Sequence, residues 1–394
     1  MPRPATAVLL LLLAAACNAP SSDATAERTV TTDSAGVRRR EIPATERPLD
    51  SALVEVARIA PADSGPASFD ALRPGNVATN AVDRLYVLVT DESRIAVFDD
   101  GGALQASWGR RGGGPGEIGF GDDLTVDADG TVWLFDYQQG AFVRFDSAGA
   151  PLPIVRVPND SAGSAEAPLF VTPDGVAFVR RRQEDDSVHR ALLLATATDT
   201  ATLRTQAQFV TRDVSFPSCP MLRMSGLPPY FSPDLTVVRT PRGVAIQPDG
   251  TWRVEWYEGA RLTEVWTRAL PPRASDATLL AAEIDGALTL RFGDNSCTVP
   301  PEEAGAARGV VATLPALRRI AVAPDGSLWA ERWEARSASP RVDVLSPDGT
   351  LRGTITGRGA PLGFLRGGRV VYAETDPETE LASLVIYRVR DAAW

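Results

Sequence analysis

The sequence predicts an all-β fold, a six-bladed β-propeller of four-stranded antiparallel blades. Short apolar segments of strand length alternate with turn residues along most of the 394-residue chain, which is typical of a repeated β-sheet protein. Asp83-Arg84, Asp129-Gly130 and Asp174-Gly175 occupy equivalent turns, at a period of about 45 residues that suits one propeller blade. A single four-stranded sheet leaves its faces uncovered, so the repeated sheets are expected to pack on each other in a ring.

Five units of four strands each are expected in chain order, each strand being an apolar run bounded by turn residues. The expected strands are 77–79, 85–89, 94–98 and 104–108; 124–126, 132–135, 141–145 and 152–157; 169–172, 176–180, 189–195 and 203–209; 236–239, 244–247, 251–257 and 262–270; and 316–322, 328–332, 341–345 and 351–356. A sixth unit has three strands, at 363–365, 370–375 and 381–389. The alternating segment 53–60 is predicted to supply its fourth strand, because this pairing removes the exposed edges at the ends of the ring.

The first 16 residues are predicted to direct the protein out of the cytoplasm. An apolar run at 8–13, too short to span a membrane, precedes three alanines and Cys17, as in a secretory signal peptide. The cysteine directly after small residues resembles a bacterial lipoprotein signal. This resemblance implies that 1–16 is removed, that Cys17 is lipidated and, from Asn18, that the protein is passed to the outer membrane. An ordinary signal peptide is the alternative.

The segment that follows the signal is predicted to be a tether. Residues 17–48 are rich in Ser, Thr, Ala, Pro and charged residues, a composition typical of flexible linkers. The propeller is then expected over residues 49–394. The protein is therefore predicted to be lipid-anchored in the bacterial cell envelope, with the anchor as its only contact with the membrane.

The glycine-rich segment 112–117 leads into 124–127, 129–133, Asp136 and Phe145-Asp146, and this run resembles the six-bladed propellers of the NHL-like type. The resemblance covers about residues 50–391. It is clear in the first, second and fifth units and weaker in the third and fourth. It implies a fold and not an activity, because such propellers include both enzymes and binding modules.

The loops of the expected blades fall into two classes. Turns within the strand pairs one–two and three–four are short and lie on one face, here named the short-turn face. The other connections lie on the opposite face, named the long-loop face, and are long, at 109–121, 159–168, 180–188, 211–229, 271–315 and 331–340. Long loops on a rigid scaffold are the usual place for binding. The insertion at 271–315, after blade four, is expected to contain a short helix capped by Ser275.

Cys219 and Cys297 lie in two of these long loops, and both loops flank blade four. Secretion would place them in an oxidising compartment, which favours a Cys219–Cys297 disulfide. Two separate buried thiols are the alternative. A disulfide here would clamp the two insertions together.

Composition excludes several classes of function. The formal net charge of −10 argues against a nucleic-acid partner, because phosphate binding needs a basic face. The single histidine, His189, excludes multi-histidine metal sites and disfavours histidine acid–base chemistry. The glycine-rich segment 112–116 lacks the lysine and the following helix of a phosphate loop.

Six charged residues are candidates for the binding face. Arg110 and Arg111 flank the glycine-rich loop, where they would contact an anion, and Arg180 begins another long loop. Asp122, Asp123 and Asp136 lie near the same face. These carboxylates suit calcium, which takes oxygen ligands, or they cap turns by accepting from loop amides. No cofactor or metal is predicted. Calcium is the one cation that these carboxylates would suit.

Two functions fit these observations. One is a binding or scaffold propeller that presents its long-loop face to a protein, peptide or glycan partner. The other is an enzyme similar to the calcium-dependent lactonase or lyase propellers, whose first strands would supply channel carboxylates from several blades. The first strands here, such as 124–126 and 320–322, are mostly apolar. The sequence therefore favours binding over catalysis.

Overall fold

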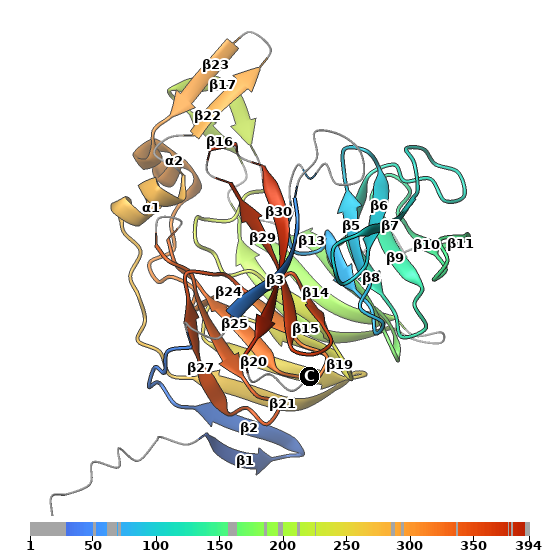
Figure 1. Cartoon of the computed structure of the whole chain (residues 1–394). Helices are drawn as coiled ribbons and strands as arrows, with labels where there is room; N and C mark the ends of the chain where they lie inside the picture. Colours follow the sequence, from blue (N-terminus) through green and yellow to red (C-terminus); the bar gives the residue numbers. More distant parts are fainter. Residues whose placement is uncertain are drawn as a thin grey trace, which may run out of the picture.

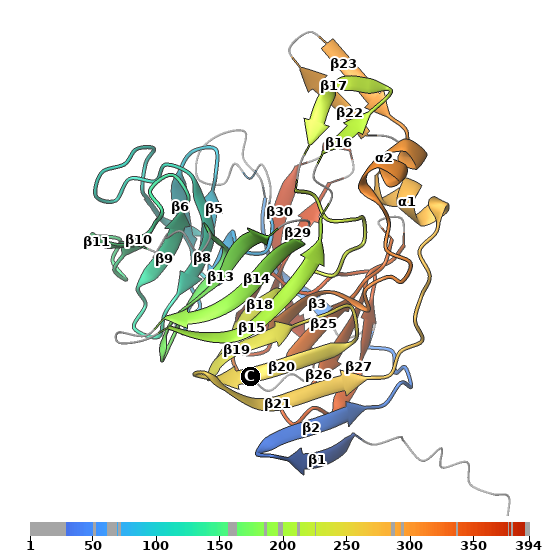
Figure 2. The same ribbon diagram turned by 180° about the vertical axis from the view of Figure 1, so that it is seen from behind.

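The computed structural model describes residues 29–49, 53–60, 69, 72–156, 164–184, 187–195, 200–210, 213–224, 226–284, 288–292, 295–335, 338–376, 378–379 and 381–390. These residues form six four-stranded antiparallel blades arranged as a propeller, with two short helices (Figures 1 and 2). The predicted fold class is confirmed. Cys17 and the rest of the predicted signal lie outside the described residues.

The first three blades follow the chain without interruption, and in each the first strand lies innermost. Blade one contains β4 (Val77–Thr79), β5 (Leu85–Val89), β6 (Arg94–Phe98) and β7 (Leu104–Trp108). Blade two contains β8 (Gly121–Val126), β9 (Val132–Asp136), β10 (Ala141–Phe145) and β11 (Pro151–Arg156). Blade three contains β12 (Ser164–Thr172), β13 (Gly175–Glu184), β14 (Ser187–Ala195) and β15 (Thr200–Phe209).

The last three blades carry the insertions and the closure of the ring. Blade four contains β18 (Thr236–Thr240), β19 (Gly243–Gln247), β20 (Arg253–Glu258) and β21 (Arg261–Arg268). Blade five contains β24 (Leu317–Val322), β25 (Leu328–Arg332), β26 (Arg341–Leu345) and β27 (Leu351–Thr356). Blade six contains β28 (Gly363–Leu365), β29 (Arg369–Thr375), β30 (Ala382–Val389) and, as its outer strand, β3 (Leu53–Ile59).

The N-terminal strand closes the ring as the sequence predicts. β3 pairs antiparallel with β30, with Leu53 opposite Val389 and Ile59 opposite Leu384. Ile59 is buried and packs against Gly102 in the turn between β6 and β7 of blade one. The strand therefore completes blade six and also contacts the next blade.

A separate apolar cluster fills each of the six interfaces between neighbouring blades. The cluster between blades six and one joins Ile59 and Leu384 to Leu85 and Val87, and the others lie between blades five and six, one and two, four and five, three and four, and two and three. Apolar burial of this kind is the main favourable term in folding. A ring with six filled interfaces is closed.

Aspartate side chains build the turns of the short-turn face. Asp99 Oδ1 accepts from the backbone N–H groups of Gly101 and Ala103 at 3.0 and 2.8 Å, and Gly102 adopts φ +86°. Asp146 repeats this geometry in blade two, with Gly149 at φ +90°. Only glycine adopts such backbone angles without steric cost. Because these turns require aspartate and glycine at fixed positions, the period of the blades can be recognised in the sequence.

The prediction of a flexible tether at 17–48 is wrong for the C-terminal part of this segment. β1 (Val30–Ser34) and β2 (Val37–Ile42) form a hairpin, and β2 pairs in parallel with β21 at the outer edge of blade four (Figure 1). Arg40 binds Glu264 of β21 at 2.8 Å. Most side chains of the hairpin face solvent, so its composition matches a linker although its backbone is paired. The folded domain therefore begins by Val30 and not at residue 49.

Two further boundaries differ from the prediction. The expected loop at 180–188 is mostly strand, because β13 and β14 extend to Glu184 and from Ser187. The insertion after blade four has two helices among its described residues, α1 (Ala277–Glu283) and α2 (Pro301–Arg308). Asp276, and not Ser275, caps α1 by accepting from Leu279 N–H at 2.8 Å.

Candidate functional site

A cavity of about 500 Å³ lies at the centre of the ring. The innermost strands β4, β8, β12, β18 and β24 line it, together with Pro361 and Leu362 before β28. Its volume falls in the range of small-ligand pockets, roughly 300–1,000 Å³. All six blades therefore contribute to one shared space.

The mouth of the cavity is assigned to the long-loop face. Each inner strand begins at that face, and most lining residues lie at or near the beginnings of these strands. Phe170, near the end of β12, and Val179 and Arg190, in the second and third strands of blade three, also line it. At the far ends of the inner strands, Arg239 of β18 reaches past blade three and donates to the carbonyl oxygen of Val126 in β8. Burial lowers the pKa of Arg239. This guanidinium spans from blade four to blade two at the short-turn end of the channel, so a ligand is expected to enter from the long-loop face.

The middle of the cavity is apolar. Leu124, Val237 and Ile320 are buried in three different inner strands, and Phe170 and Leu362 add half-buried apolar surface. An apolar wall with a few polar groups is the usual composition of a ligand pocket. This wall suits an aliphatic or aromatic group of a ligand.

Charged side chains surround the mouth. Three arginines and two aspartates line the cavity, and they are Arg190, Arg318, Arg319, Asp123 and Asp234. Arg190 forms an ion pair with Asp234. Arg318 donates to the carbonyl oxygen of Glu334 at 2.9 Å and lies 3.5 Å from Glu283 of α1. The mouth is therefore polar on several sides of an apolar interior.

Arg319 is the most buried of these cations. Its Nε lies 3.3 Å from Glu331 Oε2, and its Nη1 lies 3.3 Å from the carbonyl oxygen of Pro361. Glu331 Oε2 also accepts from Ala360 N–H, at the shorter distance of 2.7 Å. Burial lowers the pKa of Arg319, and the charge of Glu331 offsets this only in part. The guanidinium is thus held at the cavity wall by two long hydrogen bonds.

A β-bulge places Asp123 at the mouth. The register between β8 and β9 shifts between Asp122 and Leu124, and Asp123 adopts φ +42°. Bulges re-aim side chains and are frequent next to active sites, and a positive φ costs free energy in residues other than glycine. The Asp123 carboxylate packs over Gly75, where a Cβ atom would lie 2.2 Å from Oδ1. Gly75 has φ +92°, a backbone conformation that favours glycine, so a larger residue here would be strained and would displace this carboxylate.

The insertions on both sides of blade four form a cap on the long-loop face (Figures 1 and 2). The cap consists of α1, α2 and two hairpins, β16 (Val214–Phe216) with β17 (Cys219–Met224) and β22 (Leu288–Phe292) with β23 (Asn295–Val299). A disulfide joins Cys219 to Cys297, with Cα atoms 5.6 Å apart. This is the pairing favoured by the sequence, and it links the two insertions.

The cap contains an aromatic pocket next to the cavity. The pocket has a volume of about 520 Å³, and Tyr230, Phe231 and Trp333 form part of its wall. The Arg318 guanidinium lies 5.3 Å from the ring centre of Trp333 and also lines the central cavity. Arg318 therefore connects the cap to the mouth.

Replacing both Cys219 and Cys297 with serine is expected to loosen the cap. The disulfide closes a loop with a sequence separation of 78, which corresponds to about 4 kcal/mol in the chain-entropy model. Trypsin should then cleave the cap faster at Arg223 and Arg308, while the blades stay resistant. Reduced wild-type protein should behave in the same way. An unchanged cleavage rate in the variant would show that apolar packing alone holds the cap.

The sequence candidates fall mostly outside the cavity. Arg110 pairs with Glu117 at 2.8 Å on the exposed glycine-rich loop, and Arg111 donates to the Asp91 carbonyl oxygen at 3.4 Å. Arg180 lies over the Phe178 ring at 5.7 Å. The structure does not bring these three arginines to the mouth.

The three aspartates have different surroundings. Asp123 lines the cavity, whereas the neighbouring Asp122 binds Arg73 at 2.7 Å. Asp136 is fully buried and accepts from the backbone N–H groups of Gly119, Phe120 and Gln139, which is the turn-capping role. Within the described part of the chain, no three His, Cys, Asp or Glu side chains converge as a metal site.

Sequence reasoning missed Arg190, Asp234, Arg318 and Arg319. Asp234 precedes an inner strand, and Arg318 and Arg319 lie at the beginning of another. The sequence feature that could have identified them is a charged residue at the beginning of an expected inner strand. Such positions surround the long-loop end of the channel.

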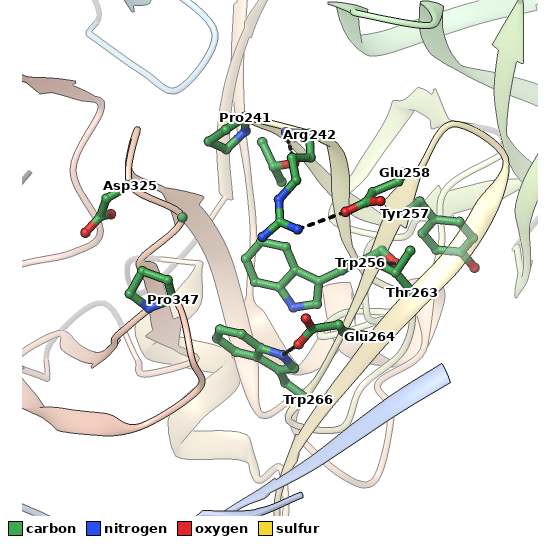
Figure 3. Close-up of a pocket in the computed structure, with 12 residues that line it drawn as sticks. Pro241, Arg242, Trp256, Tyr257, Glu258, Thr263, Glu264, Trp266, Asp325 and Pro347 are labelled. Atoms are coloured by element: carbon green, nitrogen blue, oxygen red, sulfur yellow. Dashed lines mark hydrogen bonds and ion pairs between the residues drawn. The ribbon is translucent and has the colours of Figure 1, made fainter. Parts of the chain in front are cut away.

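A second cavity lies between blades four and five at the short-turn face (Figure 3). Trp256 and Trp266 form one wall, with ring centres 4.7 Å apart, and Pro347 lies opposite. Its volume is about 80 Å³, against about 500 Å³ for the central cavity. Its charged groups pair locally, as in the 3.1 Å contact between Arg242 and Glu258. The central cavity is therefore the stronger candidate.

No family model and no curated protein sequence matches this chain. The fold is similar to that of a DUF4221 family member from Bacteroides vulgatus, with a TM-score of 0.51 and 10% identity over 86% of this chain and 98% of that one. A candidate exported protein from Bacteroides fragilis gives a TM-score of 0.49 and 10% identity over 90% and 100% of the two chains. A streptogramin B lyase gives a TM-score of 0.41 and 13% identity, over 87% of this chain and 99% of that one. At these identities the likeness is one of fold.

No helix in the described part of the chain has the length and apolar character needed to cross a bilayer.

Proposed function

We propose that this protein is an extracytoplasmic binding propeller whose central cavity takes a group from a protein, peptide or glycan partner at the long-loop face. The observation that carries this proposal is the shape of the channel. Arg239 spans its short-turn end, from blade four to the carbonyl oxygen of Val126 in blade two, and charged side chains line the cavity wall. An apolar recess with charged groups at its wall suits the binding of a ligand group.

The composition of the lining supports binding over catalysis. The cavity wall contains no serine, cysteine, histidine or tyrosine among the described residues, so it offers no pair of nucleophile and histidine base. The alternative is a calcium-dependent lactonase- or lyase-like enzyme. For that function, Asp123 of blade two and Asp234 beside blade four would supply carboxylates.

The proposed location is the cell envelope, with Cys17 as the lipid attachment point. The signal-like residues 1–17 support this location, and the Cys219–Cys297 disulfide suits an oxidising compartment. The lipoprotein and NHL-like resemblances stay predictions. Cys17→Ala is expected to move the protein from the membrane fraction to the soluble fraction of the producing bacterium. Equal distribution of the variant and the wild type would refute the anchor.

A cavity-filling variant tests the proposed binding site. Thr236 is half-buried and lines the cavity, so Thr236→Trp places an indole in the recess. Thr350 is exposed in a turn of the short-turn face, so Thr350→Trp is the matched control. A library of short peptides and oligosaccharides is screened against the wild type by thermal shift. Ligands that bind the wild type should bind Thr350→Trp equally well and should not bind Thr236→Trp. Ligands that bind Thr236→Trp as well as the wild type would overturn the proposal.

A further inference from the structure

The charge of the cavity wall restricts the class of ligand. Each of the three arginines that line the cavity lies beside a protein carboxylate, Arg190 beside Asp234, Arg319 beside Glu331 and Arg318 beside Glu283. The wall therefore accommodates a ligand of low negative charge only. A phosphate dianion would bring excess negative charge close to Asp123 and to Glu331, the partner of Arg319. A monoanion, such as a carboxylate, is the better match.

Arg319 is the residue best placed to bind that carboxylate. Its two protein hydrogen bonds both measure 3.3 Å, at the long end of the range for such bonds. Its Nη2 group donates to no protein atom in the described part of the chain. Arginine presents parallel N–H groups that match the two oxygens of a carboxylate. The buried setting strengthens this pairing, because the guanidinium is partly removed from water.

The surroundings of Arg319 favour a peptide over a simple organic acid. Ile320 and Leu124 provide an apolar wall within the same cavity, and Asp123 provides a carboxylate on a different strand. An apolar side chain would pack on this wall, and a backbone N–H group would donate to an aspartate oxygen. A carboxylate, an apolar side chain and an amide N–H occur together at the end of a peptide chain.

We propose that the mouth of the cavity binds the free C-terminal carboxylate of a peptide whose last side chain is apolar. Arg319 binds the carboxylate, the inner strands of blades two and five enclose the side chain, and Asp123 accepts from a backbone N–H group. This assignment rests on the proposed function, because it names the ligand of the same cavity.

Calorimetric titration of the mature full-length protein tests the assignment. The probes are N-acetyl-Ala-Ala-Leu, its C-terminal amide, and hexanoate. The free acid should bind, and the amide should bind at least about tenfold more weakly, since it lacks the charge that pairs with the guanidinium. Hexanoate should also bind more weakly than the free acid, because it has no backbone N–H group. These comparisons use the wild-type protein and do not depend on the folding of a variant.

Arg319→Gln should reduce the affinity for the free acid to that for the amide, with circular dichroism verifying the fold. Arg242→Gln is the control, because Arg242 is an exposed residue of the short-turn face. Equal affinity for acid and amide, or no binding of the acid, would overturn the assignment. Equal affinity for hexanoate would overturn its peptide part. If these failures occur while library ligands still lose binding to Thr236→Trp, the proposed function stands and only the ligand class is wrong.

Discussion

Ile59→Asp is expected to open the propeller ring. Ile59 is 5% exposed and packs in the apolar cluster between blades six and one. The substitution removes a buried aliphatic side chain, which alone costs roughly 2–5 kcal/mol, and adds a carboxylate that would need burial without a partner. We therefore expect a loss of at least about 4 kcal/mol in the free energy of unfolding. Urea denaturation followed by circular dichroism measures this loss.

The same strand offers a matched control. Val56 is 43% exposed and lies at the irregularity in the pairing of β3 with β30. Val56→Asp introduces the same charge on the solvent side and should change the unfolding midpoint little, because exposed substitutions usually cost less than about 0.5 kcal/mol. If Ile59→Asp is as stable as Val56→Asp, the N-terminal strand does not close the ring.

Asp343→Ala is expected to destabilise the interface of blades four and five to a similar extent. Asp343 is fully buried and binds Arg268 at 2.6 Å and Arg332 at 2.8 Å. It also accepts from Trp252 and Thr354, at 3.0 and 2.8 Å. Removing the carboxylate leaves two buried guanidinium groups without their shared partner. Breaking a buried ion pair in this way costs about 3–5 kcal/mol.

The Asp343 network also holds the N-terminal segment. Arg268 donates to the carbonyl oxygens of Pro43, Ala44 and Thr45, and Arg332 binds Glu46. Hydrogen exchange at residues 43–49 should therefore increase in Asp343→Ala. Asp91→Ala, at an exposed position, is the control for the loss of an aspartate. Unchanged stability of Asp343→Ala would show that the network is dispensable.

The same carboxylate gives the expected pH dependence. Burial alone would raise the pKa of Asp343, but the hydrogen bond from Arg332 and the charges of Arg268 and Arg332 hold it below its usual value. A lowered pKa stabilises the folded state above the unfolded-state pKa of about 3.9. This contribution is lost as the pH falls through the lower folded-state value. The wild type should therefore lose more stability than Asp343→Ala on acidification below about pH 4.

The blades were predictable because their signals are local. Aspartate caps and glycines with positive φ mark the short turns, and each strand is a short apolar run. The position of β3 also followed from local counting, since blade six lacked one strand. The hairpin of β1 and β2 was not predictable, because its pairing with β21 is between backbones and leaves polar side chains in solvent.

The site was predictable only in part, because it depends on contacts between blades. Asp123 was named as a candidate and lines the cavity, but Asp136 accepts from loop amides and Arg110 pairs with Glu117. Arg319 acquires its surroundings from Glu331 and from Pro361 before blade six. Single-strand patterns do not show which residues of different blades meet at the channel.

Hydrogen–deuterium exchange with and without a ligand from the library screen tests the central claim most directly. We predict that the ligand slows exchange at the beginnings of the inner strands, in residues 75–79, 121–126, 234–238 and 317–322. Exchange in the turns of the short-turn face, at 240–243 and 324–327, should stay unchanged. Protection confined to those turns would contradict the assignment of the binding site to the central cavity.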